Sequence, residues 1–249
     1  MKYLVGDIGN TLIKLSILSR SFKIKKTYNL ETKKIFNKKS KVSFLKKFDR
    51  KTFNKKVIFS SVVPKAFKII KKNLQTKKFK VIEIKEINIR KIIRIKIKNY
   101  NQLGSDRISN AIGSLNFKNS IIIDFGTATT FDIVKNGVYE GGVISPGVNL
   151  SILNLNKSTA LLPLLKLKNS QKNYGKNTQE ALNAGFIWGY EGLINNIIKK
   201  ISSKSNNNYK IILTGGYAKL FKRYIHKRKV FIDQNITIKG IAKILKELL

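Results

Sequence analysis

Two stretches of this chain share one pattern, and the repetition constrains the fold more than any other feature of the sequence. Each stretch has an apolar run, the motif D-x-G, and a second run rich in apolar or β-branched residues. When Asp7 is aligned with Asp124, Gly9 falls on Gly126, nearly half of the 249-residue chain away. A strand, a glycine turn and a returning strand form a β-hairpin. A hairpin that recurs at half-chain spacing predicts a duplicated domain.

The rest of the chain alternates between strand-like and helix-like patterns, which is typical of an α/β fold. Apolar runs and period-2 alternation predict strands at 56–63, 80–87, 89–97, 137–144 and 210–213. Helical spacing predicts helices at 64–72, 105–114, 178–202 and 237–249, a helical segment from 148 towards 162, and a loop at 203–209. We expect Gly185, Gly189 and Gly192 to let the helix at 178–202 pack closely. No long linker separates the halves, so we predict two domains, 1–115 and 116–249, that pack against each other.

Composition excludes several classes of protein. Hydrophobic residues make up 42% of the chain, enough for a core, which rules out a disordered protein. The absence of cysteine rules out disulfides, a thiolate nucleophile and cysteine zinc sites. The single histidine, His226, lies in a basic stretch and is predicted to be at the surface. No signal-peptide pattern or membrane-spanning apolar run occurs, so we expect a soluble, cytoplasmic protein.

The charge is strongly basic, with 51 Lys and Arg against 13 Asp and Glu, a formal +38. The lysines are spread along the chain, arginine is scarce, and no known nucleic-acid-binding motif is present. Since specific readers of DNA depend on arginine forks, we interpret the lysines as a solvated surface. Weak attraction to polyanions at low salt is still expected, and anionic substrates would be drawn in.

The first D-x-G motif lies in D-I-G-N-T, from Asp7 to Thr11. Gly9 would let the backbone approach a phosphate, and the side chains of Asn10 and Thr11 can donate to phosphate oxygens. Asp7 could then orient a phosphate-bound Mg²⁺, directly or through water. The alternative is an ordinary hairpin turn, in which Asp and Gly are favoured for their conformations.

The second motif lies in D-F-G-T-A-T-T, from Asp124 to Thr130, and offers three threonine hydroxyls with the Gly126 amide. We expect the two loops to face each other across an interdomain cleft as a phosphate clamp, since the chain has no Walker A motif. The segment 214–216, T-G-G, would be either an adenosine-side contact or a simple turn.

A third acidic residue, Asp106, lies in G-S-D-R, from Gly104 to Arg107. A carboxylate beside a guanidinium usually forms a structural ion pair. In a cleft, Asp106 could instead accept the proton of an attacking hydroxyl, while Arg107 holds an anionic group of the substrate.

Taken together, these motifs resemble type III pantothenate kinases. The likeness covers D-I-G-N-T, F-S-S-V-V-P at 59–64, G-S-D-R, D-F-G-T-A-T-T, G-G-V-I-S-P-G at 141–147, T-A-L-L-P at 159–163, G-K-N-T at 175–178 and L-T-G-G at 213–216. Eight motifs in the family's order form a specific signal. The family belongs to the actin-like ATPase superfamily, together with sugar and acetate kinases. The resemblance therefore implies two duplicated ribonuclease-H-like domains with the active site in the cleft.

The resemblance also implies the reaction and its residues. The reaction is ATP-dependent phosphorylation of pantothenate, the first step of coenzyme A synthesis, with Mg²⁺ accompanying ATP. Implied ATP contacts are Asp7, Ile8, Gly9, Asn10, Thr11, Leu12, Ile13, Lys14 and Thr127. Implied pantothenate contacts are Gly104, Ser105, Asp106, Arg107 and Thr178, with Asp106 as proton acceptor. Asp124 would bind K⁺ or NH₄⁺. A homodimer with substrate near the subunit interface is implied too, and Trp188 and Tyr190 would lie in the core or in that interface.

Two positions depart from the family pattern. Ser105 stands where the family usually has Ala, a small change. The family has a substrate-contacting Tyr seven residues before the glycine of G-x-D-R; here that position is Ile97, and Tyr100 lies three residues later. Either Tyr100 replaces that contact through a shift in the loop, or the contact is lost.

Two other functions remain as alternatives. A non-catalytic regulatory relative of the same fold would have no chemical need for Asp7, Asp106 and Asp124 together, and a turnover assay distinguishes it. A basic nucleic-acid-binding protein would bind DNA strongly, with a site preference and a steep dependence on salt.

Overall fold

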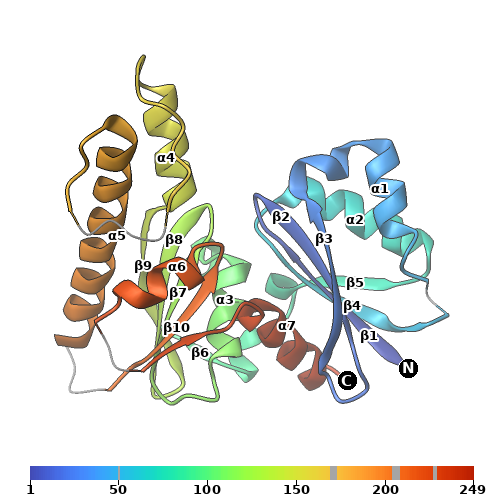
Figure 1. Cartoon of the computed structure of the whole chain (residues 1–249). Helices are drawn as coiled ribbons and strands as arrows, with labels where there is room; N and C mark the ends of the chain where they lie inside the picture. The colour runs from blue at the N-terminus through green and yellow to red at the C-terminus, as the bar shows by residue number, and fades with distance from the viewer. Residues whose placement is uncertain (50, 169–172, 204–207, 227–228) are drawn as a thin grey trace. The chain divides into compact units, whose positions relative to one another are not determined.

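The computed structural model describes residues 1–49, 51–168, 173–203, 208–226 and 229–249 (Figure 1). Its contacts divide the chain into two compact units. The first unit comprises residues 1–118, 134–141 and 235–249, and the second comprises 119–133 and 142–234. We predicted a boundary between the two duplicated halves of the sequence, at 115/116. These contact units do not test that boundary, which stays a prediction.

The first unit is built on a sheet with the strand order β3-β2-β1-β4-β5. These strands are β1 (Lys2–Ile8), β2 (Leu12–Leu18), β3 (Ile24–Glu31), β4 (Phe53–Ser61) and β5 (Lys80–Glu83). β1, β2 and β3 pair in antiparallel fashion, and β4 and β5 run parallel to β1. The α-helices of this unit are α1 (Lys38–Leu45), α2 (Pro64–Thr76), α3 (Ser105–Gly113) and α7 (Ile236–Glu247). Its 3₁₀ turns are η1 (Thr32–Phe36), η2 (Ile84–Glu86), η3 (Ile89–Lys91) and η4 (Tyr100–Gln102).

The second sheet has the order β11-β10-β7-β8-β9-β6. Its strands are β7 (Ser120–Phe125), β8 (Ala128–Lys135), β9 (Val138–Pro146), β10 (Lys210–Gly215), β11 (Val230–Ile232) and, at one edge, β6 (Arg94–Ile95). β6 pairs with Val138 and Tyr139 of β9, and all of these residues are grouped in the first unit. The helices of the second unit are α4 (Val148–Lys157), α5 (Thr178–Ser203) and α6 (Ala218–Phe221), followed by the turn η5 (Lys222–Tyr224).

The two sheets repeat one topology. The order β3-β2-β1-β4-β5 recurs as β9-β8-β7-β10-β11, and β10 and β11 are parallel to β7 as β4 and β5 are to β1. Both D-x-G motifs join neighbouring strands, β1 to β2 and β7 to β8. The predicted hairpins and the α/β class with two sheets are therefore confirmed, and the shared order is what duplicated domains would give.

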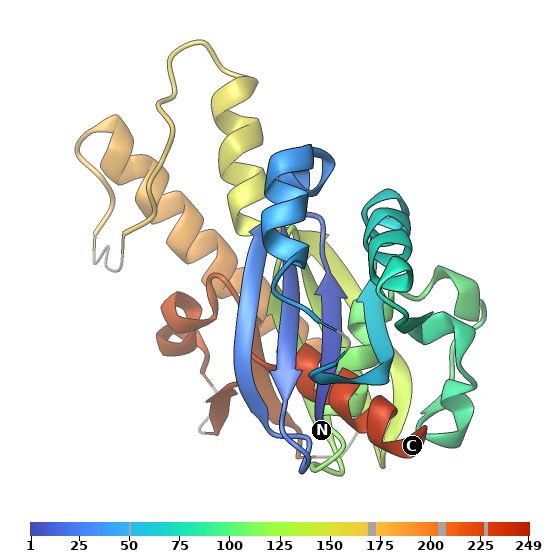
Figure 2. The same cartoon turned by 90° about the vertical axis from the view of Figure 1, so that its right-hand side faces the viewer.

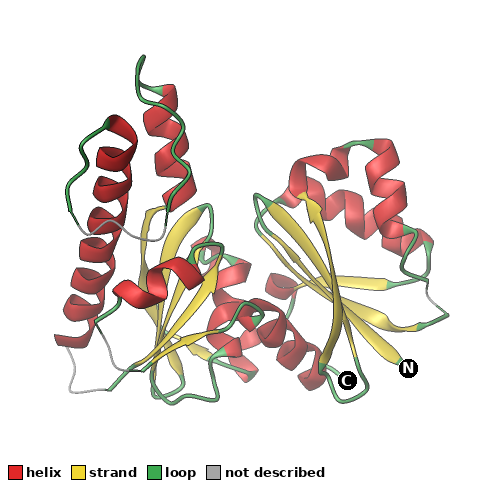
Figure 3. Cartoon of the chain, viewed as in Figure 1, coloured by secondary structure: helices red, strands yellow, loops and turns green. Residues whose placement is uncertain are grey.

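Helices cover the first sheet on both of its faces (Figure 3). Leu4 and Val57 pack with Phe44 of α1 and Ile70 of α2 in one core cluster. Side chains alternate along a strand, so the fully buried Val5 points to the opposite face, where α7 contacts β1 and β4. A second cluster joins β7 and β10 to α5, and Tyr190 belongs to it with only 8% of its surface exposed.

α3 and α7 lie side by side in both views (Figures 1 and 2). A Cβ added to Gly240 would lie 1.9 Å from the Ser109 carbonyl oxygen, and one added to Gly113 would lie 2.3 Å from the Ile236 carbonyl oxygen. At this crossing, the hydroxyl of Thr237 donates to Asn110 Oδ1 at 2.7 Å. Two glycines therefore permit the close approach of the helix that begins at Ser105.

Within the described residues of a single chain, the glycines of α5 do not give the close packing that we expected. A Cβ at Gly185, Gly189 or Gly192 would meet no described atom within 4 Å. These positions lie on the exposed side of α5, whereas its buried residues Ile187, Ile194 and Ile198 face the second core. The close helix crossing of this fold is at Gly113 and Gly240 instead.

Two predicted strands are also wrong. The expected strand at 80–87 ends at Glu83, and 89–97 contains the turn η3 and only the short β6. The buried isoleucines are Ile84, Ile89 and Ile93, whose spacing of four and five residues is not the alternation of a strand. The chain turns at Glu83 because its carboxylate accepts a hydrogen bond from the Lys85 amide at 2.6 Å.

The remaining helices and strands lie close to their predicted ranges, although β4 begins earlier, α2 ends later and α4 stops at Lys157. The strands β3 and β11 and the helices α1 and α6 were not predicted. The expected loop at 203–209 lies mostly outside the described residues. Among the helices that the structure describes, none is long and apolar enough to cross a membrane.

Half-buried lysines stabilise the ends of helices in the first unit. Lys77 donates to the carbonyl oxygens of Leu45 at 2.6 Å and Phe48 at 2.9 Å, where α1 ends. Lys243 donates to Ile112 at 3.3 Å near the end of α3, and Lys56 donates to Leu248, the residue that follows α7, at 2.6 Å. Because carbonyl groups at a helix end lack partners within the helix, an ammonium group there satisfies them and complements the helix dipole.

Candidate functional site

Three sequence motifs of the first unit meet at one edge of its sheet. The parallel strands β1, β4 and β5 end together there, with Asp7 in register with Ser60 and Phe59 in register with Glu83. The Val62 amide, just after β4, donates to the Ile8 carbonyl at 3.0 Å. Val62 also lies beside Gly104, because a Cβ added to Gly104 would be 3.7 Å from Val62 Cγ1. The carboxyl ends of parallel strands are where α/β proteins bind ligands.

The loop between β1 and β2 is tightly held and exposes polar groups. The Gly9 amide donates to the Leu12 carbonyl at 3.0 Å, and the Thr32 hydroxyl donates to the Gly9 carbonyl at 2.7 Å. Asn10 and Thr11 are exposed at the tip, and Leu12 and Lys14 are half-buried. Ile8 and Ile13 are fully buried in the core, so only their backbone remains available to a nucleotide.

Asp106 lies in the first turn of α3, next to the edge formed by β1, β4 and β5. Its Oδ1 accepts a hydrogen bond from the Arg107 amide at 2.8 Å. A Cβ on Gly104 would lie 2.4 Å from the same oxygen, so the carboxylate folds back over a residue without a side chain. Burial raises the pKa of the Asp106 carboxyl, and the Arg107 amide and charge, with Lys85, oppose that shift. A carboxylate of raised pKa is a better proton acceptor than an ordinary aspartate.

Tyr100 lies in η4, close to this turn. Its hydroxyl oxygen is buried and has no hydrogen-bond partner among the residues that the structure describes. Burial raises the pKa of the Tyr100 hydroxyl, the charge of Glu83 adds to the shift, and Arg90 opposes it. The Glu83 carboxylate, whose charge acts on this hydroxyl, also accepts a hydrogen bond from the Ser105 hydroxyl.

In the second unit, the loop after β7 has the same hydrogen bond in a shorter form. The Gly126 amide donates to the Ala128 carbonyl at 3.1 Å, and the loop has one residue fewer than its counterpart after β1. Gly147 packs against this loop, because a Cβ there would lie 2.0 Å from the Thr127 carbonyl oxygen. Thr127 itself is exposed.

Asp124 lies at the end of β7 in register with Thr214 of β10, as Asp7 is with Ser60. Gly215 has φ +84°, and a Cβ there would lie 2.7 Å from Asp124 Oδ1. Gln234 Nε2 donates to the Gly215 carbonyl at 3.1 Å. The T-G-G motif thus forms a turn that packs against the Asp124 carboxylate.

Thr178 is the first residue of α5 and is exposed. The Asn177 side chain accepts from the Glu180 amide, and the Glu180 carboxylate accepts from the Lys176 amide, both at 2.9 Å. This reciprocal capping fixes the start of the helix. The G-K-N-T motif therefore has a local structural role in addition to any substrate contact.

The residues at the strand ends suit different cations. Ser60 is fully buried, and its hydroxyl has no partner in the described part of the chain; it lies in register with the Asp7 carboxylate. Asp124 and Thr214 form a second pair of oxygen donors. Among the described residues no cluster of three His, Cys, Asp or Glu side chains occurs. Single carboxylates with hydroxyl oxygens fit Mg²⁺ or an alkali cation that shares its coordination with phosphates and water.

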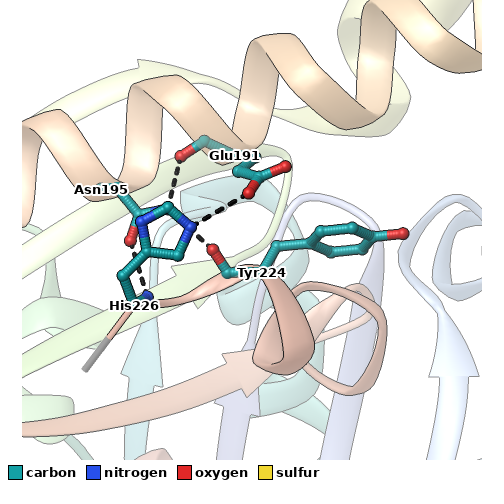
Figure 4. A network of polar contacts seen from close by, with 4 residues as sticks. All are labelled: Glu191, Asn195, Tyr224 and His226. Carbon is teal, nitrogen blue, oxygen red and sulfur yellow. Dashed lines mark hydrogen bonds and ion pairs between the residues drawn. The ribbon is translucent and has the colours of Figure 1, made fainter. Parts of the chain in front are cut away.

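His226 is at the surface, as predicted, with 70% of its side chain exposed. Its Nε2 lies 3.1 Å from Glu191 Oε1, and its amide donates to Asn195 Oδ1 at 3.0 Å (Figure 4). Asn195 Nδ2 in turn donates to the Tyr224 carbonyl at 2.7 Å. This network attaches the segment after η5 to α5, which is a structural role.

Sequence comparison identifies relatives along most of the chain. A family profile described as type III pantothenate kinase matches residues 3–200. The type III pantothenate kinase of Pelagibacter ubique is 45% identical over 243 residues, which is 96% of this chain and 97% of that protein. The type III pantothenate kinase of a Sulfurihydrogenibium species is 36% identical, with the same coverage of both chains.

Solved structures with the same fold are more distant in sequence. A Baf family protein from Campylobacter jejuni aligns with a TM-score of 0.65 at 21% identity, covering 98% of both chains. The activator of 2-hydroxyisocaproyl-CoA dehydratase from Clostridium difficile, with bound ADPNP, gives 0.61 at 15% identity and covers 100% of this chain and 98% of its own. A polyphosphate/ATP-glucomannokinase from Arthrobacter gives 0.53 at 13% identity, covering 100% and 99%. These likenesses establish the actin-like fold.

Proposed function

This chain belongs to the type III pantothenate kinase family, and we propose that it phosphorylates pantothenate with ATP. The product is 4′-phosphopantothenate, and the reaction is the first step of coenzyme A synthesis. The observation that carries the assignment within the structure is the meeting of the Asp7 loop and Asp106 at one sheet edge of the first unit. The Asp7 loop suits the binding of phosphate groups, and the Asp106 carboxylate suits proton transfer.

Asp106 is the proposed proton acceptor. As the primary hydroxyl of pantothenate attacks, its oxygen bonds to the γ-phosphorus, and the bond to the β–γ bridging oxygen breaks. ADP leaves, and the hydroxyl proton passes to the Asp106 carboxylate. The raised pKa of Asp106, caused mainly by burial, supports this role because it brings the carboxylate closer to the basicity that the transfer needs.

The phosphates of ATP are assigned to the exposed tip of the first hairpin. Asn10, Thr11 and the backbone from Asp7 to Lys14 would contact them, and the exposed Thr127 is a further proposed ATP contact. Mg²⁺ would be held by Asp7, with the buried Ser60 hydroxyl beside it, and when bound it would neutralise phosphate charge.

The pantothenate end is assigned to Gly104, Arg107 and Thr178, and to the backbone of Ser105, whose side chain is buried against Glu83. Arg107 suits the pantothenate carboxylate, since a guanidinium can form two parallel hydrogen bonds with one. The buried hydroxyl of Tyr100 supports its replacement of the tyrosine that the family has at the position of Ile97.

Asp124 is the proposed ligand of a monovalent cation, K⁺ or NH₄⁺. Its carboxylate at the end of β7, packed against Gly215, supports this assignment. Turnover should fall when both cations are replaced by a large organic cation at constant ionic strength. Full turnover in such a buffer would refute the assignment.

We assign a homodimer to the exposed side of α5. Gly185, Trp188, Gly189 and Gly192 recur there at helical spacing, and Trp188 is 43% exposed. Small residues beside an exposed tryptophan would let α5 of a second copy approach closely. Trp188→Glu should produce monomers in light scattering, whereas Lys199→Glu, at an exposed position of the same helix, should remain dimeric.

The proposed enzyme works in the cytoplasm, and its basic surface binds nucleic acids only weakly and without a site preference. The deciding experiment measures ADP release that depends on pantothenate, with acetate and glucose as alternative acceptors. Release of ADP with pantothenate, but not with acetate or glucose, supports the proposal. No turnover with any acceptor would favour a non-catalytic relative.

A further inference from the structure

Glu83, the last residue of β5, uses both carboxylate oxygens in hydrogen bonds. Oε2 accepts from the Lys85 amide at 2.6 Å, which caps the turn η2. Oε1 accepts from the Ser105 hydroxyl at 2.5 Å. The first bond is local, whereas the second connects residues 22 positions apart. The Glu83 side chain is therefore held by the Lys85 amide next to it, and its other oxygen connects β5 to the start of α3.

Ser105 is the first residue of α3, and only 1% of its surface is exposed. Its hydroxyl donates to Glu83, and its carbonyl accepts from the Ser109 hydroxyl at 2.7 Å. A hydrogen bond to an ionised acceptor, shielded from water, is stronger than an ordinary one. The first turn of α3 is thus attached to β5 by a part-buried, charge-assisted contact.

Asp106 follows directly, and the contacts of its carboxylate come from its own turn. Oδ1 accepts from the Arg107 amide and lies over Gly104. The position of this carboxylate is consequently set by the position of the turn. The hydrogen bond from Ser105 to Glu83 fixes that turn against the edge where β1, β4 and β5 end.

Lys85 extends the same arrangement to the neighbouring loop. Its Nζ donates to the Asn101 carbonyl in η4 at 2.9 Å. Lys85 also lowers the pKa of Asp106, against the larger effect of burial. The turn 83–85 therefore contacts both segments that flank the proposed acceptor site, and its charges act on both.

We propose that Glu83 is a positioning residue for phosphoryl transfer: its carboxylate holds Ser105, and through it the first turn of α3, where Asp106 can accept the proton of the substrate hydroxyl. The inference rests on the proposed function. It gives Ser105 a role that the usual alanine of the family would not supply, and it gives Glu83 a function that the sequence does not reveal.

The test compares Glu83→Ala, Glu83→Gln, Ser105→Ala and the double variant Glu83→Ala/Ser105→Ala. A misplacement of reacting groups by about 1 Å costs on the order of 100-fold in rate. We therefore expect kcat to fall by about 10- to 100-fold in Glu83→Ala and Ser105→Ala, with the KM for ATP changed by less than about two-fold. Glu83→Gln keeps an acceptor for Ser105 and should recover part of the loss.

Coupling between the two residues is the sharper readout. If Glu83 acts through Ser105, the double variant should be no slower than the slower single variant, because one contact is lost in all three. The matched control is Glu86→Gln, three residues along the same turn, whose exposed carboxylate pairs with Lys71 at 2.9 Å. That variant should keep the kcat of the unmodified enzyme.

Kinetics should be measured well below the melting temperature of each variant, so that only folded enzyme contributes. A purely structural contact would lower the melting temperature and leave kcat unchanged. The inference is overturned if kcat stays within about two-fold in Ser105→Ala, which alters the fewest atoms, or if the losses multiply in the double variant. The variant Asp106→Asn distinguishes failure of the proposed function from failure of the positioning role. If Asp106→Asn stays active, the proposed function is wrong. If it is inactive while the Glu83 variants have normal kcat, only the positioning role of Glu83 is wrong.

Discussion

The crossing of α3 and α7 leaves no room for a methyl group at Gly240, so Gly240→Ala should destabilise the first unit. The new Cβ would lie 1.9 Å from the Ser109 carbonyl oxygen and 3.0 Å from the Gly113 nitrogen. Both neighbours are backbone atoms, which cannot rotate away. Ordinary contact needs about 3.5 Å, so the helices must separate by roughly 1.5 Å.

The cost can be set against a known gain. Forcing an extra methyl group into a packed site costs about 1–3 kcal/mol, and separation also strains the Thr237–Asn110 hydrogen bond. Ala is favoured over Gly in a helix by about 0.8–1 kcal/mol. The steric cost and the strained hydrogen bond together should exceed the gain in helix propensity. The free energy of unfolding should therefore fall by about 2 kcal/mol. At about 2–4 °C per kcal/mol, the melting temperature should fall by about 4–8 °C.

Thermal unfolding followed by circular dichroism measures this loss, and Lys239→Ala, one residue away and exposed, is the control. The control should stay within about 0.5 kcal/mol of the unmodified protein. Because Ser109 is in the same helix as Asp106, kcat should fall as well at temperatures where the variant is folded. An unchanged or higher melting temperature for Gly240→Ala would show that the crossing is looser than described.

Asp106→Asn should lower kcat by about 10²- to 10⁴-fold and leave ATP affinity within a few-fold, as calorimetric titration can check. It should also raise the melting temperature at pH 7: the folded pKa of Asp106 lies above its unfolded value, so the favourable contribution of this group is lost as pH rises through the folded pKa. Lys85→Met should move the acid limb of the kcat/KM profile to higher pH, because Lys85 lowers the pKa of Asp106; an unmoved limb would exclude that influence. Tyr100→Phe should raise the KM for pantothenate by a few-fold up to about tenfold, without loss of stability, because the hydroxyl has no partner among the described residues; an unchanged KM would place it outside the substrate site. Lys77→Met should cost about 1–2 kcal/mol in urea unfolding by releasing the carbonyls of Leu45 and Phe48, and the exposed Lys72→Met should cost nothing measurable.

The hairpins could be predicted because their signal is local. Asp7 and Gly9, like Asp124 and Gly126, lie within a few residues of the turn that they shape, and the apolar runs on either side identify the strands. The family motifs are of the same kind, since each occupies one strand end or one helix start. This is why the segments proposed for the candidate site could be named from the sequence before any contact was known.

Contacts between distant residues could not be predicted in the same way. The glycines of α5 and those at the α3–α7 crossing look alike in sequence, but of these five only Gly113 and Gly240 meet another helix in the described part of the chain. Glu83 occurs in a run of alternating isoleucines and charges, where it suggests an exposed strand position. The hydrogen bond between Glu83 and Ser105 depends on how β5 and α3 meet in space. Glu83 also caps the turn η2, and this turn is the reason that β5 ends earlier than predicted.

The grouping of α7 with the N-terminal residues has a consequence for the order of synthesis. Thr237 and its partner Asn110 are 127 positions apart, and the whole of the second unit is translated between them. At about 5–20 residues per second, this interval lasts roughly 6–25 s. During that time the apolar side of α3, with Ile108 and Ile112, has no α7 to cover it. The turn that carries Asp106 is therefore among the last parts of the nascent chain to reach its final packing, and until then it offers a binding site for chaperones.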